Sequence, residues 1–479
     1  MNREFVLIRL YRLGDLLMAT ALARAWKAEE PTHLTWIVGE ECAGLLRGQP
    51  FIDRLIVVPG RFIERFLHRT SFGEGDGEER FPVEAARAEF PQVFAALPER
   101  ADRVVNLQFN TAAAILAGAI RTEERAGPYA GEDGRKCVDD PWSQYYLATG
   151  ADIRFSIVHW VDAFLHIGGA RREDPATMFL LRPDPVFGAA FERARNGVPY
   201  FVVQVGSYED QKRWDEMRYA AAAAEIAKAT GRFVVLVGGR AERVLCLRVE
   251  RALEEAGVPC LTLAGRTDFH QLGQVLVGAD VVLGNDTFTQ HFAAALDVGA
   301  VTVFQGDPSP WLTLAYRRGN RAVAEDDGSP PSVERVVGAA LGTRHDFLHA
   351  RRLHGYQFPM PVDPKSATEG WRRRWIVGCG HLRALDPTFP EGKAIRAGYP
   401  QWWVDRIEAA IDALERGEPL DPASVDRALL DAEPHHPLKT LLVMLMVKNR
   451  YAAASGDPSY HLGNYRWALE ALARAGQVE

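Results

Sequence analysis

Cysteine is scarce in this chain, and the way it is spaced excludes two common kinds of site. The 479 residues include five scattered cysteines, Cys42, Cys137, Cys246, Cys260 and Cys379, with no CxxC pair and an odd total. Zinc sites and the disulfide frameworks of small secreted domains both depend on paired cysteines. We therefore expect neither a disulfide framework nor a zinc site, and a cytoplasmic, reducing setting fits best. No cofactor is expected either.

Long apolar runs are lacking as well. No stretch approaches the roughly 20 apolar residues that span a bilayer. The first apolar run, residues 5–8, lies between Glu4 and Arg9 and is too short for the core of a signal peptide. We expect neither a leader nor a spanning helix, so any contact with a membrane would be peripheral.

Strong charge of one sign is also missing. The net charge is −7, and 47% of the residues are hydrophobic and 25% charged, which is ordinary for a globular protein. This balance argues against nucleic acid as a partner. A length of 479 residues exceeds what one hydrophobic core usually serves, so two or three domains are expected.

Two standard nucleotide-binding motifs are absent from the sequence. There is no GxGxxG and no GxxxxGK[ST]. This speaks against both a standard dinucleotide-binding fold and a P-loop. A nucleotide, if bound, would have to be held by another arrangement of amides and charges.

Short apolar runs alternate with helical patterns through most of the chain. Strands are predicted at residues 5–10, 34–38, 55–58 and 103–107 in the first part, and at 200–205, 233–237, 261–263, 281–283 and 301–304 in the second. Such alternation predicts parallel sheets with right-handed crossovers. A proline-containing stretch, residues 171–184, is predicted to link the two parts.

The predicted architecture is α/β, with two Rossmann-like, doubly wound domains facing a cleft and a helical extension. We place the domains at residues 1–170, 171–345 and 346–479. In such sheets ligands bind beyond the carboxyl ends of the strands. Six polar residues follow predicted strands and are expected to line one cleft: Asp15, Ser207, Lys212, Glu242, Asp286 and His291.

Residues 281–296 form the stretch around which the prediction is organised. A short apolar strand breaks at Gly284 and is followed by an alanine-rich helical pattern. Thr287 with Gln290 three residues later fits a capping box and predicts the helix start. Amides from Phe288 onward and the positive end of the helix dipole would then attract phosphate. A second interpretation makes Asp286 a helix cap and His291 a packed side chain.

The side chains expected at this site match the needs of a nucleoside diphosphate sugar. Lys212 and Arg213 supply positive charge, and Glu242 is placed to bind ribose hydroxyls. A carboxylate such as Asp15, across the cleft, would act as general base and remove the proton of an acceptor hydroxyl. In the alternative interpretation, Asp15 simply caps the helix that follows the tight turn at Gly14.

In combination, these motifs resemble the bacterial heptosyltransferases, glycosyltransferase family nine, over roughly residues 1–345. They are Arg12-Leu13-Gly14-Asp15, Thr35-Trp36-Ile37-Val38-Gly39, Lys212-Arg213-Trp214, Gly238-Gly239 with Glu242, and Gly284-Asn285-Asp286-Thr287 with His291 and Ala293-Ala294-Ala295. The resemblance implies a GT-B fold and an inverting, metal-independent transfer of heptose from ADP-heptose to the lipopolysaccharide core at the cytoplasmic face of the inner membrane.

The resemblance also implies a role for each site residue. Asp15 would be the catalytic base, Lys212 a phosphate contact, and Ser207 a neighbour of the phosphates. Glu242 would bind the ribose and Asp286 the sugar hydroxyls. The pyrophosphate cradle would comprise Thr287, Phe288 and Thr289, with His291 beside it. The family usually has glycine in place of Phe288, so the geometry of the donor differs there.

Several alternatives remain open on the sequence. Arg61, Arg65 and Arg69 recur every four residues opposite apolar side chains, which fits either a helix on an anionic membrane or a helix packed on its own domain. The tail includes Trp371-Arg372-Arg373-Arg374-Trp375, which either binds phosphate head groups or a glycan, or packs on the main body of the protein. The whole protein could also be a non-catalytic scaffold that binds a nucleotide sugar or a glycan, or a glycosyltransferase that uses another nucleotide sugar or a protein acceptor.

Overall fold

The computed structural model describes most of the chain. The described residues are 2–67, 82–151, 156–170, 176–306, 309–353, 356–362, 401–416, 439–451 and 458–476, with 367, 368, 381, 382, 385, 422, 425 and 429. The predictions made for residues 69 and 371–375 lie outside them.

The chain divides into two compact units. Unit 1 comprises the described residues of Met1–Tyr11, Ala25–Arg172 and Arg372–Glu479, and unit 2 those of Arg12–Arg24 and Glu173–Trp371. Asp15 was predicted to belong to the first domain, but its segment groups with the second unit. The predicted division into three domains remains a prediction.

Unit 1 is built on a five-stranded parallel sheet. Its strands are β1 (Arg3–Ile8), β2 (Thr32–Gly39), β3 (Arg54–Val58), β4 (Arg103–Asn106) and β5 (Glu124–Ala126), in the order β3-β2-β1-β4-β5. The central strand reads as an uninterrupted apolar run because helices cover both faces of such sheets. Phe5 and Leu7 are fully buried on it. The predicted parallel sheet is confirmed.

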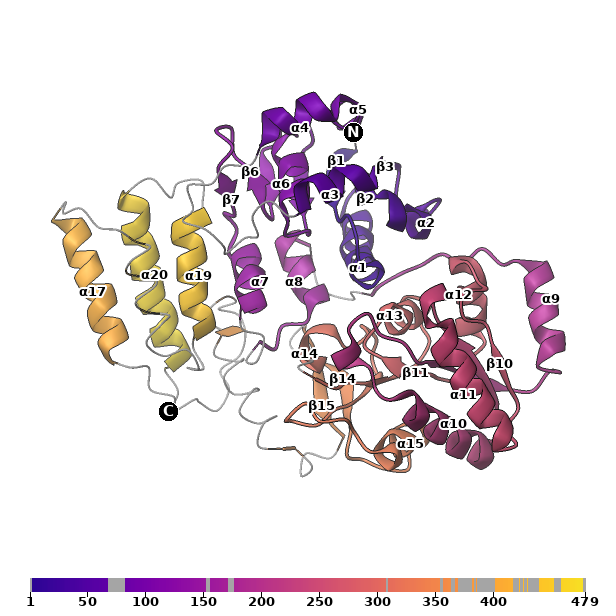
Figure 1. Cartoon of the computed structure of the whole chain (residues 1–479). Helices are drawn as coiled ribbons and strands as arrows, with labels where there is room; N and C mark the ends of the chain where they lie inside the picture. The colour runs from indigo at the N-terminus through magenta and orange to yellow at the C-terminus, as the bar shows by residue number, and fades with distance from the viewer. Residues whose placement is uncertain are drawn as a thin grey trace. The chain divides into compact units, whose positions relative to one another are not determined.

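Helices and a small hairpin complete the body of unit 1 (Figure 1). They are η1 (Glu40–Cys42), α2 (Ala43–Leu46), α3 (Gly60–Leu67), α4 (Val83–Glu89), α5 (Pro91–Ala96), α6 (Thr111–Gly118), β6 (Tyr129–Ala130), β7 (Lys136–Cys137), α7 (Pro141–Ala151) and α8 (Trp160–Ile167). α1 (Leu13–Glu29) contributes to both units. On α3, Phe62 and Phe66 are 0% and 1% exposed, so these rings belong to the protein core and not to a lipid-facing side.

Unit 2 contains an eight-stranded sheet. Its strands are β8 (Tyr200–Gln204), β9 (Phe233–Val237), β10 (Cys260–Thr262), β11 (Val282–Asn285), β12 (Ala300–Val303), β13 (Arg321–Val323), β14 (Leu348–Leu353) and β15 (Tyr356–Pro361). The order is β10-β9-β8-β11-β12-β13-β14-β15, parallel up to β13 and antiparallel afterwards.

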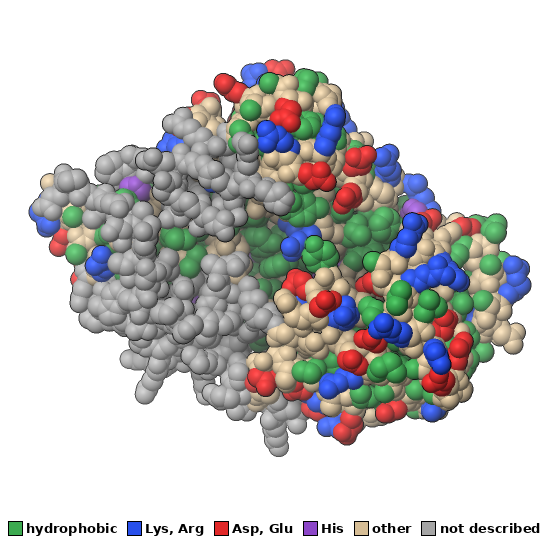
Figure 2. All heavy atoms as spheres, in the orientation of Figure 1, with side chains coloured by type: hydrophobic (Ala, Val, Ile, Leu, Met, Phe, Trp, Pro, Cys, Tyr) green, Lys and Arg blue, Asp and Glu red, His purple; other side chains and the backbone are tan. Residues whose placement is uncertain are grey.

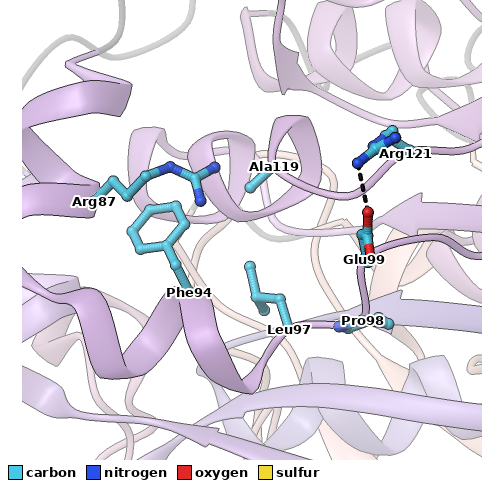
Figure 3. A pocket seen from close by; sticks show the side chains of 7 residues that line it. All are labelled: Arg87, Phe94, Leu97, Pro98, Glu99, Ala119 and Arg121. Carbon is cyan, nitrogen blue, oxygen red and sulfur yellow. Dashed lines mark hydrogen bonds and ion pairs between the residues drawn. The ribbon is translucent and has the colours of Figure 1, made fainter.

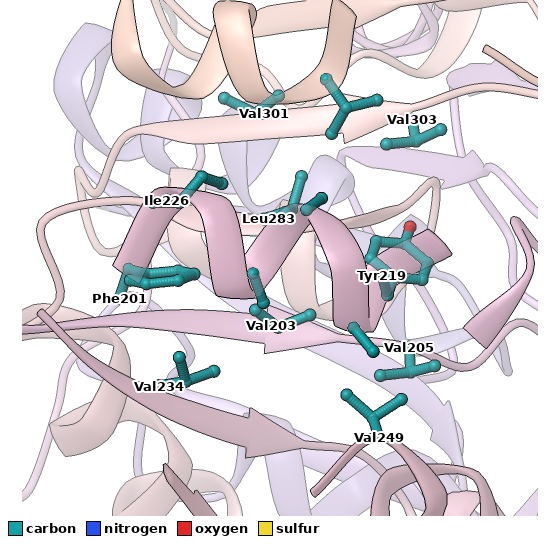
Figure 4. Packing of buried hydrophobic residues seen from close by; sticks show 14 of the residues in the cluster. Phe201, Val203, Val205, Tyr219, Ile226, Val234, Val249, Leu283, Val301 and Val303 are labelled. Carbon is teal, nitrogen blue, oxygen red and sulfur yellow. The ribbon is translucent and has the colours of Figure 1, made fainter. Parts of the chain in front are cut away.

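The helices of unit 2 pack on this sheet through branched and aromatic side chains. They are α9 (Pro185–Ala194), η2 (Asp210–Lys212), α10 (Glu216–Thr230), η3 (Arg240–Glu242), α11 (Arg243–Glu255), α12 (Phe269–Val277), α13 (Phe288–Ala295), α14 (Pro310–Thr313) and α15 (Val333–Leu341). Figure 4 shows Tyr219 and Ile226 of α10 over Phe201, Val203 and Val205. This buried core fixes the strand ends that carry the polar residues.

The start of the predicted helical extension is wrong, because β14 and β15 continue the sheet of unit 2. β13 offers an open edge, and Leu348 pairs with Ala322 along it. Tyr356 and Phe358 alternate along β15 and are fully buried, which is a strand pattern. A helix would have placed these two rings on different faces.

The later tail is helical, as predicted, and belongs to unit 1. It contains α17 (Gln401–Glu415), α19 (Lys439–Tyr451) and α20 (Pro458–Gly476), with α20 in contact with both other helices and α19 packed on α7 (Figure 1). Met444 and Leu445 of α19 are fully buried. The tail therefore contributes to the core of this unit.

The surface carries charges of both signs. Figure 2 shows lysine and arginine interspersed with aspartate and glutamate over the described residues of one face. None of the described helices combines the length and the apolar character needed to cross a bilayer.

Candidate active site

The predicted site residues of unit 2 gather where the strand order reverses. β8 lies between β9 and β11, and the chain moves outward in opposite directions from this pair. Ligands of doubly wound sheets bind at such a switch point, beyond the carboxyl ends of the strands. Ser207 follows β8, Glu242 ends η3 after β9, and Asp286 and Thr287 follow β11.

α13 begins where the sequence predicts, but its cap differs. Thr287 is the N-cap residue, yet its side chain makes no capping hydrogen bond. Its Oγ1 instead donates to Gln204 Oε1 over 3.1 Å. The predicted capping box is wrong, because Gln290 is fully buried and accepts from Thr302 Oγ1 at 3.5 Å. The first amides of α13 are therefore left without a side-chain cap, as an anion site requires.

Phe288 packs along the side of α13. Its ring stacks on Phe292, one turn further on, with centroids 5.1 Å apart and an interplanar angle of 24°. Phe269 of α12 contacts the same ring edge-on at 5.7 Å. Residues four apart share one helix face, so the ring lies toward α12 and not along the helix axis. Thr289, the next residue, is buried.

Glu242 is held over the ends of β8 and β9. The Gly239 amide donates to its Oε2 at 2.6 Å, and Gln204 Nε2 donates to its Oε1 at 3.0 Å. A Cβ at Gly206 would lie 1.6 Å from Glu242 Oε1, so only glycine leaves room for this carboxylate. Burial raises the pKa of Glu242, and the two hydrogen bonds oppose that rise.

Lys212 and Arg213 lie on a short loop and are paired with acidic neighbours. Lys212 Nζ donates to Glu209 Oε1 at 2.8 Å, and Arg213 Nη1 donates to Asp210 Oδ1 at 2.6 Å. Lys212 holds the pKa of Glu209 below its ordinary value. Both pairs are partly exposed, so each contributes little energy and can exchange for another anion.

Asn285 fixes this loop to the sheet. It is fully buried, and its Oδ1 accepts from the Trp214 amide at 2.9 Å. Its Nδ2 donates to the carbonyls of Val205 and Gly206 at 3.0 and 2.8 Å. The cationic loop and the ends of β8 and β11 are thus held together by one side chain.

Asp15, Asp286 and His291 form an acidic and imidazole cluster within unit 2. Asp286 Oδ1 lies 3.7 Å from His291 Nε2, and Thr313 Oγ1 donates to Asp286 Oδ2 at 2.6 Å. Burial raises the pKa of Asp286, and the charge of Asp15 adds to that rise. Burial lowers the pKa of His291, against the opposing charges of both carboxylates. Asp15 is itself only 7% exposed.

The backbone at the start of α1 is unusual. Arg12 has φ of 67°, a left-handed conformation that is uncommon outside glycine, and its carbonyl accepts from the Leu16 amide at 3.1 Å. Leu13, Gly14 and Asp15 follow it, so the left-handed residue lies three positions before Asp15. Residues in such conformations are often found at functional sites.

Sequence reasoning missed three residues of this site. Gln204 gave a weak signal, as a polar residue ending an apolar strand, and Asn285 lies within the motif Gly284-Asn285-Asp286-Thr287. Thr313 gave no signal in the sequence, because it lies 27 residues after Asp286 and reaches it only through the placement of α14.

A cavity of about 270 Å³ lies elsewhere, in unit 1. Figure 3 shows Arg87 beside the Phe94 ring and the ion pair of Arg121 with Glu99 at its rim. Leu97, Pro98 and Ala119 complete the lining. It contains none of the predicted site residues. Among the described residues, no group of three or more histidine, cysteine, aspartate or glutamate side chains is placed to hold a metal ion.

Comparison with known proteins identifies the family of this chain. The model of glycosyltransferase family 9 (heptosyltransferase) matches residues 92–337, just over half of the chain. The chain therefore belongs to glycosyltransferase family 9, and the predicted glycosyltransferase identity is confirmed. Lipopolysaccharide heptosyltransferase 1 of Pseudomonas aeruginosa is 26% identical over 339 residues, which cover 69% of this chain and 86% of that protein.

Solved structures agree on the fold. A glycosyltransferase family 9 protein from Veillonella parvula superposes with a TM-score of 0.53 at 17% identity, covering 71% of this chain and 96% of that one. The E. coli ADP-heptose lps heptosyltransferase II gives a TM-score of 0.50 at 18% identity, covering 71% and 98%. The predicted GT-B fold is confirmed.

Proposed function

We propose that this protein transfers a heptose, with inversion, from ADP-heptose to a sugar of the lipopolysaccharide core, with Asp15 as the general base. The proposal rests on one observation: Asp15 is buried, and the backbone of Gly14 before it lies so close to His291 of α13 that a Cβ there would be 2.9 Å from the ring. The relatives' names support the donor and the acceptor, since they specify ADP-heptose and lipopolysaccharide.

The donor's diphosphate would be bound at the uncapped start of α13. Amides of Phe288 and Thr289 and the helix dipole would face it, and Lys212 and Arg213 would exchange their acidic partners for phosphate oxygens. Lys212 already acts electrostatically on Asp286, so its charge is near the cluster. These charges would stabilise the departing diphosphate without a metal ion.

The sugar and ribose would be oriented by carboxylates on either side of the diphosphate. Glu242 would accept hydrogen bonds from the ribose hydroxyls, and Ser207 lies on the loop beside it. Asp286, held by Thr313, would bind sugar hydroxyls, with His291 beside it. Because burial lowers its pKa, His291 would be neutral at pH 7. Asp15 would then remove the acceptor's proton, an effect worth typically ~10²–10⁴-fold in rate.

The test replaces Asp15 with asparagine. Asp15→Asn should bind ADP as the unaltered protein does, while transfer from ADP-heptose falls by about 10²–10⁴-fold. Asp280→Asn is the control, because Asp280 pairs with Arg232 at the amino end of β11 and should leave transfer unchanged. Transfer by Asp15→Asn within about threefold of the unaltered rate would remove Asp15 from the mechanism.

The base of the donor is tested separately with nucleoside diphosphates. ADP at about 100 times its Kd should stabilise the protein by about 2.7 kcal/mol, which thermal denaturation detects readily. GDP and UDP serve as comparisons at the same concentration. A larger shift with either would assign a different nucleotide sugar, and binding of ADP without turnover on any glycan would favour a non-catalytic scaffold.

A further inference from the structure

Gln204 ends the buried strand β8 and uses both ends of its side-chain amide. It is 2% exposed, although the four residues before it are apolar. Its Oε1 accepts from Thr287 Oγ1 at 3.1 Å, and its Nε2 donates to Glu242 Oε1 at 3.0 Å. A buried amide is costly unless both ends are bonded, so this pair of contacts explains how a glutamine is tolerated here.

The chemistry of the partners fixes the orientation of this amide. A carboxylate oxygen accepts hydrogen bonds, and the NH₂ group of Gln204 faces Glu242 Oε1. The carbonyl oxygen then faces Thr287, whose hydroxyl must donate to it. The Thr287 hydroxyl proton is thereby committed to Gln204. At the start of α13, the backbone amides and not the Thr287 hydroxyl would therefore bind phosphate.

Glu242 depends on Gln204 for its position. The Gly239 amide donates to its Oε2, and Gln204 Nε2 donates to its Oε1. The carboxylate fits only because residues 206 and 238 are glycines. A Cβ on Gly206 or Gly238 would lie 1.6 or 2.7 Å from the carboxylate, respectively. A carboxylate lying over glycine has no side chain beneath it to hold it in place. Gln204 supplies the restraint from the β8 side.

We propose that Gln204 is a positioning residue that holds the ribose-binding carboxylate and the start of the phosphate-binding helix at a fixed spacing. Glu242 and Thr287 lie on different loops, and one side chain joins them. A nucleoside diphosphate places its ribose and phosphates a few bonds apart, so it requires that spacing. The inference rests on the proposed function, since it assumes a nucleotide at this site.

The experiment measures binding of ADP and 2′-deoxy-ADP by titration calorimetry to the full chain. Gln204→Met keeps the length of the side chain and removes both hydrogen bonds. Leaving a buried carboxylate short of a donor costs about 1–3 kcal/mol, so the Kd for ADP should rise about 5- to 150-fold. The preference for ADP over 2′-deoxy-ADP should fall toward one, because a displaced Glu242 no longer reads the 2′-hydroxyl.

Coupling is tested with Thr287→Val. If Gln204 joins the two groups, the effects of Gln204→Met and Thr287→Val on the Kd for ADP will be less than additive in the double variant. Gln271→Met is the matched control, because Gln271 also donates to a carboxylate, Asp184 at 3.0 Å, and accepts from an amide, Asp268 at 3.1 Å. It should lower the Tm yet leave the ADP preference unchanged.

If Gln204→Met fails to fold, a second variant, Gln204→Glu, tests the same role. Gln204→Glu retains an acceptor for Thr287 and places a second carboxylate against Glu242, so ADP binding should be weak at pH 8 and recover as the pH falls and one proton is shared. An ADP preference unchanged in both variants, or additive effects with Thr287→Val, would overturn the role of Gln204. Failure of the unaltered protein to bind any nucleoside diphosphate would instead overturn the proposed function and this inference with it.

Discussion

The imidazole of His291 lies directly against the backbone of Gly14. A Cβ on Gly14 would be 2.9 Å from His291 Cδ2 and 3.6 Å from Nε2. Real Cβ atoms do not approach this closely, and His291 is buried, so its ring has little room to retreat. The glycine before Asp15 is therefore needed for contact with α13 as well as for the turn.

Gly14→Ala should accordingly impair transfer more than nucleotide binding. The added methyl group would push Asp15 away from Asp286 and His291, and misplacement on the order of 1 Å costs about 10²-fold in rate. We expect kcat to fall about 10- to 100-fold while the Kd for ADP stays within about threefold. Gly463→Ala in α20 is the control, because no atom lies within 4 Å of the added Cβ. Equal kcat values for the two variants would contradict this role.

Glu209 should compete with the nucleotide for Lys212. Their contact of 2.8 Å holds the lysine in the ligand-free state, and Arg12 also attracts Glu209. An exposed ion pair contributes about 0.2–1 kcal/mol, so Glu209→Gln should tighten ADP binding by about 1.5- to 5-fold. Calorimetry at low and high salt measures this, with the gain shrinking at high salt. Weaker binding by Glu209→Gln would mean that Glu209 itself supports the ligand.

Asp286 should reduce the stability of the folded protein at neutral pH. Burial raises the pKa of Asp286 in the folded state. Protonated Asp286 therefore stabilises the folded protein at a pH below the pKa it has in the unfolded chain. That stabilisation is lost as the pH rises through the higher pKa of the folded state. Asp286→Asn, which stays neutral, should raise the Tm at pH 7, by about 2–4 °C per kcal/mol gained. Thermal denaturation between pH 4 and pH 8 should show the difference shrinking toward acid. A lower Tm at pH 7 would contradict this.

The helical tail should be part of the folding unit of unit 1. Leu445 on α19 is fully buried, and truncating such a side chain costs about 2–5 kcal/mol. Leu445→Ala should therefore lower the Tm well beyond Leu247→Ala, whose parent side chain is 44% exposed. Calorimetric unfolding of the full chain makes the comparison. Equal Tm values would show that α19 is not coupled to the rest.

The strands and the motif residues could be predicted because their signals are local. Phe5 and its neighbours in β1, and Val282 and Leu283 in β11, are apolar runs that can only be buried. The residues after such strands in a parallel sheet share one edge, so Glu242, Asp286 and Thr287 could be brought together from the sequence.

The remaining details depend on contacts between distant residues. Thr287 looked like the first member of a capping box, but Gln204, 83 residues away, accepts its hydroxyl hydrogen. The local helix pattern does not reveal that Gln204 binds the Thr287 hydroxyl in place of a helix amide. Likewise, residues 348–353 and 356–361 became strands because β13 offered an edge, which local helical propensity does not reveal.

The division of the chain has a practical consequence for dissecting the protein. Residues Glu173–Trp371 form one continuous stretch of unit 2, but Arg12–Arg24 reach that unit from the far end of the sequence. A recombinant fragment covering only the continuous stretch would carry the start of α13, Glu242 and Asp286, yet would lack Asp15. Comparing this fragment with the full chain would show whether the fold of unit 2 requires the segment that carries Asp15.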